Sequence, residues 1–382
     1  MKIISLFLCL SIALSGCWDK NELTSLAITT GVAFDTEESE EDIQMTAQII
    51  NLGTLAPAAV QSSIANPPYW NLKTRGKTVF DCIRNATMQS PKKLYWAHNQ
   101  IIVFSEDLAR QEGVGEYLDF FFRDAEPRIS IWLLVSKGSA SDILKMDSKL
   151  DPIPAMNISS LIENRSNNAK ASAVDLYEFS NRQLSQATAP VMSYIQLLSA
   201  NGEKTPLLSG TAVFNRDFKM IGTLNERETR GMLWVINHLD NGLLVMPSPQ
   251  DEVNISIEVI SAKTKIEPQI INGELKIKIL VREKGVLGDA DGFVDVLDKE
   301  LWNRINQGQA AVIRQDILLS LEQARLLKAD IFGFGDAVYK KYPREWKEIK
   351  EDWIDIFPAL EVEIQVQTAL VRPNMILHSI NK

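Results

Sequence analysis

The stretch that decides the fold class is EPQIINGELKIKILV, residues 267–281. Two strand-like runs flank Asn272-Gly273, a dipeptide that favours the two-residue turns of β-hairpins. The stretch therefore predicts a hairpin of two adjacent antiparallel strands.

The segments around this hairpin alternate between strand and helix patterns. Residues 253–259 alternate cleanly, and 210–224 reads as two short strands around a turn at 215–217. Asn225, with Glu228 three residues later, forms a capping-box pattern that predicts the start of a helix. A long helical spacing at 295–328, a short helix, an aromatic and basic helix at 340–353 and a final strand at 361–371 complete this half.

The N-terminal half carries the same mixture. Strand patterns occupy 26–34, 43–50, 94–104 and 129–135. Helices are expected around Cys82, after Ser105, at 116–122 and at 175–186, whereas 151–170 is polar, contains two prolines and is expected to be a loop or crossover. Hairpins and helices in this order predict an α+β, multi-domain protein with mixed or antiparallel sheets and packed helices.

The chain begins with an apolar leader that stops at a cysteine. Lys2 is followed by a mostly apolar run at 3–14, which is shorter than the roughly 20 residues a membrane span needs. Leu14, Ser15 and Gly16 before Cys17 resemble the bacterial lipoprotein processing signal, in which the leader is removed and the thiol acquires lipid. A plain secretory signal with a chance cysteine, or an uncleaved anchor, are the alternatives.

Charge and cysteine content narrow the function classes. The formal net charge of −9 repels a phosphate backbone, so nucleic acid is not an expected partner. The cysteines are Cys9, Cys17 and Cys82; loss of the leader and acylation of Cys17 would leave Cys82 without a partner in the chain. The helical spacing of Val79, Cys82 and Ile83 predicts a buried thiol.

Motifs of enzymatic chemistry are missing from the sequence. The three histidines, His98, His238 and His378, are isolated, and there is neither an HExxH nor a GxSxG motif. The GFGD run at 333–336 lacks the third glycine of a phosphate loop and is interpreted as a turn between helices. We therefore predict no catalytic residue, no metal site and no cofactor.

Four long motifs resemble the Ger(x)C family, the lipoprotein C subunits of spore germinant receptors. They are GCWDKNELTSLAITTGVAFD (16–35), LYWAHNQIIVFSEDLAR with FFFRDAEPRISIWLLVSKG (94–138), LSGTAVFNRDFKMIGTLNERETRGMLW (208–234), and a closing region from ADIFGFGDAVYKKYPREWKEI to DWIDIFPALEVEIQVQTALVRPNMI (329–376). They follow the family's order and cover nearly the whole mature chain, except residues 151–205, which carry no usable motif.

The resemblance implies a non-enzymatic subunit tethered by Cys17 to the outer face of the inner spore membrane. Its partners would be the polytopic A and B receptor subunits, which sense nutrients. The implied organisation is a signal peptide at 1–16, an N-terminal region at 17–205 that is open to division into two subdomains, and a C-terminal domain at 206–382.

Several residues match the family's motifs and are candidates for partner contacts. The candidate contacts are His98, Arg123, Glu228, Tyr342 and Trp346. Each has a structural alternative; Trp346, for example, suits a helix face packed on the core. Gly333, Gly335 and Pro343 also match, and suit a tight turn and a helix start.

Two other functions remain as alternatives. The first is a substrate-binding lipoprotein that delivers a small solute to a transporter, a class that usually has two α/β lobes and a hinge. The second is an envelope enzyme, which the absence of a nucleophile–base or metal constellation disfavours.

Overall fold

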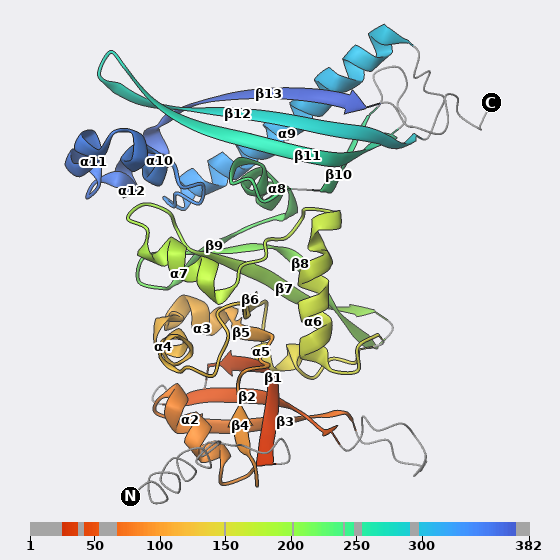
Figure 1. Cartoon of the computed structure of the whole chain (residues 1–382), viewed down its shortest axis with the longest axis vertical. Helices are drawn as coiled ribbons and strands as arrows, with labels where there is room; N and C mark the ends of the chain where they lie inside the picture. Colours follow the sequence, from red (N-terminus) through yellow and green to blue (C-terminus); the bar gives the residue numbers. More distant parts are fainter. Residues whose placement is uncertain are drawn as a thin grey trace, which may run out of the picture.

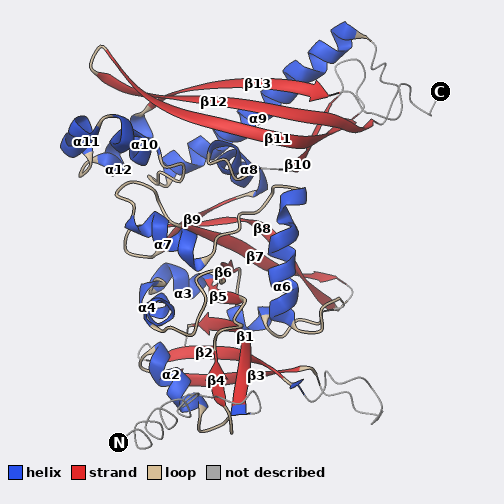
Figure 2. Cartoon of the chain, in the orientation of Figure 1, coloured by secondary structure: helices blue, strands red, loops and turns tan. Residues whose placement is uncertain are grey.

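The computed structural model describes residues 25–36, 42–52, 67–148, 150–200, 202–239, 241–247, 254–290 and 298–371. In this part of the chain, a nine-stranded sheet and a four-stranded sheet lie one above the other along the long axis (Figure 1). Helices pack between and around the two sheets (Figure 2). The architecture is α+β with mixed sheets, as the sequence predicted.

The large sheet has the strand order β3-β2-β1-β5-β6-β7-β8-β9, with β4 paired to β1. Its centre, β1-β5-β6-β7, is parallel, and antiparallel strands flank it on both sides. The strands are β1 (Leu26–Asp35), β2 (Ile43–Ile50), β3 (Tyr69–Gly76), β4 (Lys93–Tyr95), β5 (Ile101–Ser105), β6 (Trp132–Ser136), β7 (Val191–Ala200), β8 (Glu203–Phe214) and β9 (Met220–Leu224).

Helices cover both faces of the parallel centre. In β5, Ile102 and Phe104 belong to one hydrophobic cluster, whereas Ile101 and Val103 belong to another on the opposite face. The first face carries α2 (Val79–Ala86), α3 (Glu106–Gln111), α4 (Gly115–Arg123) and α7 (Leu176–Leu184); the second carries α5 (Ala140–Ile143) and α6 (Pro154–Glu163), which η3 (Asn164–Asn167) follows. Strands buried on both faces show continuous apolar runs instead of alternation.

The smaller sheet has the order β10-β11-β12-β13. Its elements are β10 (Gly242–Pro247), β11 (Asn254–Ile271), β12 (Glu274–Ala290) and β13 (Glu361–Val371), with α8 (Glu226–Val235), α9 (Lys299–Leu326), α10 (Phe334–Lys341), α11 (Pro343–Ile349), α12 (Trp353–Ile356) and η4 (Phe357–Ala359). The predicted hairpin is confirmed, because Ile271 pairs with Glu274 and both Asn272 (φ 54°) and Gly273 (φ 86°) are left-handed. Such a turn requires positive φ at both central residues.

One hydrophobic cluster runs through both sheets. It contains Phe214 of β8 as well as Ile279 of β12, and α8 lies between the two sheets in Figure 1. The division at residues 205/206 falls inside β8, a strand of the large sheet. The domain boundary therefore stays a prediction.

Two predicted elements are wrong. Residues 94–104 form β4 and β5 separated by a turn, in which the Asn99 N–H donates to the carbonyl of Trp96 at 3.0 Å. The Trp96 side chain is buried at this turn. Residues 151–170 contain α6, whose first residue is Pro154. Proline is tolerated there because the N–H at the first helical position has no intrahelical partner.

The capping box and the Cys82 helix are confirmed. The Asn225 N–H donates to the Glu228 carboxylate at 2.7 Å, and the Asn225 side chain accepts from the Glu228 N–H at 3.0 Å. Cys82 is fully buried on α2, and burial, with Asp81 nearby, raises the pKa of its thiol to about 12. The thiolate is the reactive form of cysteine, so this thiol is a core group.

A close contact between α8 and α9 sets the distance between these two helices of the smaller sheet. A Cβ on Gly231 of α8 would lie 2.1 Å from the backbone oxygen of Asp316 in α9. The Asp316 carboxylate is fully buried and accepts from Arg230 (2.7 Å) and Arg227 (3.1 Å) of α8.

Gly231→Ala should therefore lower the free energy of unfolding by about 1–3 kcal/mol, because the added methyl group forces the helices apart. The measurement is the urea midpoint of the purified chain. Gly288→Ala is the matched control, because its Cβ would meet only the Ser256 oxygen at 3.6 Å. Equal midpoints for the two variants would contradict the close packing.

Candidate functional site

The residues of the GFGD motif form a turn around a buried carboxylate. Asp330 is 3 % exposed and precedes the motif in the connection between α9 and α10. We call residues 330–336 the Asp330 turn. The carboxylate accepts hydrogen bonds from four backbone N–H groups and one indole: those of Phe332 (3.2 Å), Gly333 (2.9 Å), Phe334 (3.1 Å), Gly335 (2.8 Å) and Trp353 Nε1 (3.2 Å).

Backbone conformation and packing explain why glycine occupies both positions of the motif. Gly333 has φ 79°, the left-handed region that favours glycine, at the start of α10. A Cβ on Gly335 would lie 2.2 Å from the Cβ of Ala187 and 2.8 Å from the Trp346 ring. The motif therefore forms a tight turn, as predicted. Its second glycine also allows a close approach to the segment that follows α7, which the sequence did not predict.

The Asp330 turn is bonded to the connection between α7 and β7. The Asp336 carboxylate accepts from Ser185 Oγ (2.7 Å) and Thr188 Oγ1 (2.6 Å). The backbone N–H of Ala189 donates to the Asp330 carbonyl at 2.8 Å, and Arg182 donates to the Ile331 carbonyl at 3.1 Å. We call residues 182–189 together with the Asp330 turn the joint, because it connects segments about 150 positions apart.

Burial perturbs the charged groups of the joint. Desolvation raises the pKa of the Asp330 carboxyl, and the hydrogen bonds from Gly335 and its neighbours oppose that rise. Desolvation also lowers the pKa of Arg216, which donates to the Gln183 carbonyl at 2.9 Å, while Asp336 and Asp330 act in the opposite direction. Within the joint, Asp330 and Arg182 are buried and carry opposite charges, whereas Arg216, which lies beside it, is exposed.

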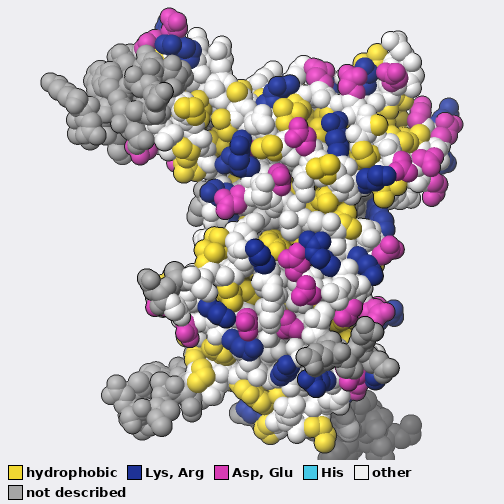
Figure 3. All heavy atoms as spheres, turned by 180° about the vertical axis from the view of Figure 1, so that it is seen from behind, with side chains coloured by type: hydrophobic (Ala, Val, Ile, Leu, Met, Phe, Trp, Pro, Cys, Tyr) yellow, Lys and Arg dark blue, Asp and Glu magenta, His cyan; other side chains and the backbone are white. Residues whose placement is uncertain are grey.

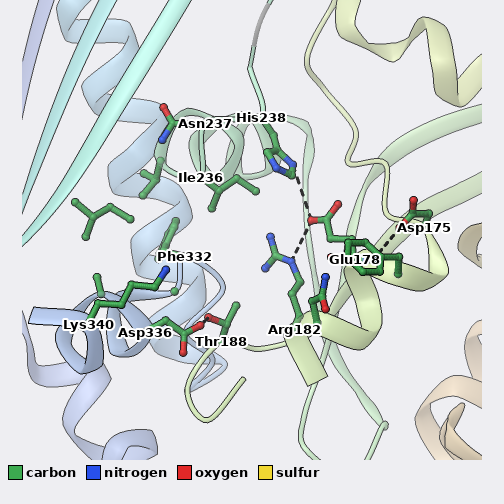
Figure 4. Close-up of a pocket in the computed structure, with 16 residues that line it drawn as sticks. Asp175, Glu178, Arg182, Thr188, Ile236, Asn237, His238, Phe332, Asp336 and Lys340 are labelled. Carbon is green, nitrogen blue, oxygen red and sulfur yellow. Dashed lines mark hydrogen bonds and ion pairs between the residues drawn. The ribbon is translucent and has the colours of Figure 1, made fainter. Parts of the chain in front are cut away.

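An open groove of ≈ 720 Å³ runs beside the joint, between α7, the end of α8 and α10 (Figure 4). Glu178 lies on one wall, with Arg182 Nε at 3.2 Å and His238 Nδ1 at 3.9 Å from the same carboxylate oxygen. Lys340 and Asp336 lie on the opposite wall. Polar and apolar side chains both line the groove, and Arg182 is a cationic partner of the Glu178 carboxylate.

The predicted contact residues do not come together. His98 is exposed in the turn before β5, and Arg123 is exposed at the end of α4, where it pairs with Asp119 at 2.7 Å. Glu228 is half-buried and engaged in the capping box of α8. Only Tyr342 and Trp346 are neighbours.

These two neighbours differ in exposure. Tyr342 is half-buried, whereas Trp346 is 1 % exposed and donates through Nε1 to Gln186 at 3.2 Å. The burial of Trp346 matches its structural alternative, packing on the core. Pro343 opens α11, as expected. Cys17 and His378 lie outside the described residues.

Sequence reasoning missed three buried acids. Asp330 could have been suspected from its place three residues before a Gly-x-Gly, where backbone N–H groups converge. Asp316 follows Ile313 at helical spacing and therefore falls on the buried face of α9. Glu283 lies in β12, where the apolar pattern of the inner face is interrupted by one carboxyl group.

Glu283 is the most strongly perturbed acid away from the joint. It is 2 % exposed, accepts from Gln309 Nε2 of α9 at 2.6 Å, and burial raises its pKa to about 8. Its other carboxyl oxygen and Gln309 Oε1 have no hydrogen-bond partner. The carboxyl group is therefore largely protonated at neutral pH.

Neither a metal centre nor a membrane span is found in the described ranges. No group of three His, Cys, Asp or Glu side chains there could hold a metal ion. No helix in the same ranges is long and apolar enough to cross a membrane.

Asp330→Asn should destabilise the chain by about 2–4 kcal/mol, because the amide cannot accept five hydrogen bonds and places an NH₂ group among donors. The measurement is urea unfolding followed by tryptophan fluorescence, since Trp353 donates to Asp330. Asp355→Asn, at an exposed ion pair with Lys328, is the control and should change stability by less than about 0.5 kcal/mol. An unchanged free energy of unfolding in Asp330→Asn would contradict the role of the carboxylate.

Glu283 predicts a defined pH dependence of stability. Its folded pKa of about 8 is above the ordinary value of 4.5, so the folded state holds a proton that the unfolded state releases between these values. Its contribution is complete below pH 4.5 and is lost as pH rises to 8, by at most about 1.4 kcal/mol per pH unit. Glu283→Gln should remove this slope in urea titrations at several pH values. An unchanged slope would refute the assignment.

Comparison with known proteins gives the same family for both halves. The model described as "Spore germination protein N-terminal domain" matches residues 19–197. The model described as "Spore germination B3/ GerAC like, C-terminal" matches residues 209–374.

Similar proteins match over nearly their full lengths. Spore germination protein KC of Bacillus subtilis (strain 168) is 25% identical, over 95% of this chain and 93% of that protein. Spore germination protein B3 of the same organism is 25% identical, over 94% of each chain. The crystal structure of the GerBC protein is similar in fold, with a TM-score of 0.57 and 20% identity over 92% of this chain and 100% of that chain. The chain therefore belongs to the GerAC, or Ger(x)C, family of spore germination proteins.

Proposed function

We propose that the chain is a lipid-anchored, non-catalytic subunit of a nutrient germinant receptor that assembles with polytopic A and B subunits. Its place would be the outer face of the inner spore membrane. The observation that carries the proposal is the match to both family models in order, beginning at residue 19, two residues after the lipoprotein-type cysteine. The proposed units are residues 1–16, 17–205 and 206–382.

The sequence before the described residues supports the anchor. Residues 1–16 fit an export leader, and two acyl chains on Cys17 suffice for stable membrane attachment. Ser25 is eight residues after Cys17, so an extended linker reaches about 28 Å at most. The anchor would therefore hold the β1 end of the molecule close to the membrane.

The joint supports a scaffolding role. It binds the Asp330 turn to the α7–β7 connection through buried hydrogen bonds, which favours one fixed orientation of the two sheets. A rigid subunit can hold its membrane partners in fixed relative positions without catalysing a reaction. His98 and Arg123, both exposed, and the half-buried Tyr342 remain proposed partner contacts.

The same contacts disfavour a substrate-binding lipoprotein. That class needs two lobes that close around a solute, with a hinge as the connection between them. Here hydrogen bonds of the joint connect residues that line the groove, including that of Thr188 Oγ1 to the Asp336 carboxylate at 2.6 Å. Opening the groove would break them.

Cys17→Ala should abolish incorporation of labelled palmitate and shift the protein from the membrane to the soluble fraction of spores, with slower nutrient-triggered germination. The fold should persist, because every described residue lies beyond position 24. Cys82→Ala, which removes the buried thiol, is the control and should keep the label. Normal germination with soluble protein would show that the anchor is not needed.

A further inference from the structure

One end of the molecule combines exposed apolar and basic side chains. It is the end where the described chain begins, at the bottom of Figure 1. Three apolar side chains are exposed there, Leu52 (48 %), Trp70 (43 %) and Met88 (86 %). Three lysines are exposed among them. We call this set the basal surface: Leu52, Trp70, Lys73, Met88, Lys92 and Lys93.

Strand pairing brings the basal surface beside the start of β1. Leu26 pairs with Lys93 of β4, and Thr29 pairs with Ile49 of β2, which in turn pairs with Trp70 of β3. Adjacent strands are about 4.8 Å apart, so these positions lie within a few strand spacings of each other.

The residues that follow α2 lie beside β3, next to Lys73. Gln89 Nε2 donates to the Lys73 carbonyl at 3.2 Å, and Lys73 and Met88 line one hollow of ≈ 480 Å³. Met88 therefore lies beside Lys73.

The local charge is opposite to that of the whole chain. Residues 67–93 contain six Lys or Arg and one Asp, a formal charge of +5. Two of these lysines pair with acids from outside the range, Lys77 with Asp42 (3.0 Å) and Lys93 with Glu126 (2.6 Å), which leaves a local charge of +3 in a chain of −9. Charges separated by more than about 10 Å are largely screened at 0.1 M salt, so a nearby surface senses mainly the local positive charge. Figure 3 shows hydrophobic and Lys or Arg side chains intermixed at this lower end.

We propose that the basal surface binds directly to anionic phospholipid, with the lysines on lipid phosphates and Trp70 and Met88 in the interfacial layer. Tryptophan favours the membrane–water interface, because its ring is apolar while its N–H is polar. Lysine stems bury along apolar groups while their ammonium groups stay with the phosphates. A polybasic patch is also the usual second signal beside a lipid chain.

The short linker makes this contact geometrically possible. Ser25 precedes Leu26, the partner of Lys93, and is within about 28 Å of Cys17 along an extended chain. The orientation of the body on a spore membrane rests on the proposed anchor, whereas binding of the basal surface to phospholipid does not. This second contact would restrict rotation of the tethered body. It would keep the long axis of the body pointing away from the bilayer surface.

The test uses the unacylated chain, residues 18–382, which retains every described residue. Its binding is measured by sedimentation with vesicles of phosphatidylcholine alone or of phosphatidylcholine with phosphatidylglycerol. Binding only to the anionic vesicles, weakened by added salt, is expected. Lys73→Gln/Lys92→Gln/Lys93→Gln should reduce the partition coefficient on the order of 100-fold, at about fivefold per lysine.

Two further variants make the result specific. Lys263→Gln/Lys284→Gln/Lys347→Gln changes the net charge equally at exposed sites of the second half, and should bind like the unmodified chain. Trp70→Ala should weaken binding without changing its salt dependence. Circular dichroism checks that each variant is folded.

Absence of binding to anionic vesicles, or equal loss in the two triple variants, would overturn the proposal. In the first case the basal surface would be assigned to an acidic protein partner. Palmitate on Cys17 without vesicle binding would leave the proposed receptor function standing. Vesicle binding by residues 18–382, with no lipid found on Cys17 of the protein isolated from spores, would contradict only the anchor.

Discussion

The buried carboxylate of Asp330 is the constraint on which the arrangement of the two sheets depends. Five N–H groups converge on it, and this convergence shapes the turn that carries Gly333 and Gly335. The turn then places Asp336 against Ser185 and Thr188. A single buried acid thus organises a contact between parts of the chain that are distant in sequence.

That contact gives a simple physical account of the proposed scaffolding role. The family's glycine motif serves packing, since Gly335 lies where a methyl group would collide with Ala187. The body it stabilises is elongated, with the start of β1 at one end and β11–β13 at the other (Figure 1). In the proposed function, the first end faces the membrane and the second is presented to the partner subunits.

Local signals predicted those elements whose structure is determined locally. The Asn272-Gly273 hairpin and the Asn225 capping box depend on neighbouring residues, and both were predicted correctly. The break between β4 and β5 was missed because Trp96 is buried by distant aromatic residues, and α6 because Pro154 was read as a breaker. The joint could not be predicted, because Asp336 and Thr188 meet only through the tertiary fold. The basal surface was hidden by the overall charge of −9.

The central claim is that this body works as a membrane-held subunit and not alone. The most direct measurement is affinity purification of the chain from detergent-solubilised spore membranes, with identification of co-purifying proteins and the mass of the N-terminal peptide. The account predicts two polytopic partners and a diacylated Cys17. Recovery of the chain alone, or with a solute permease and no A or B subunit, would contradict it.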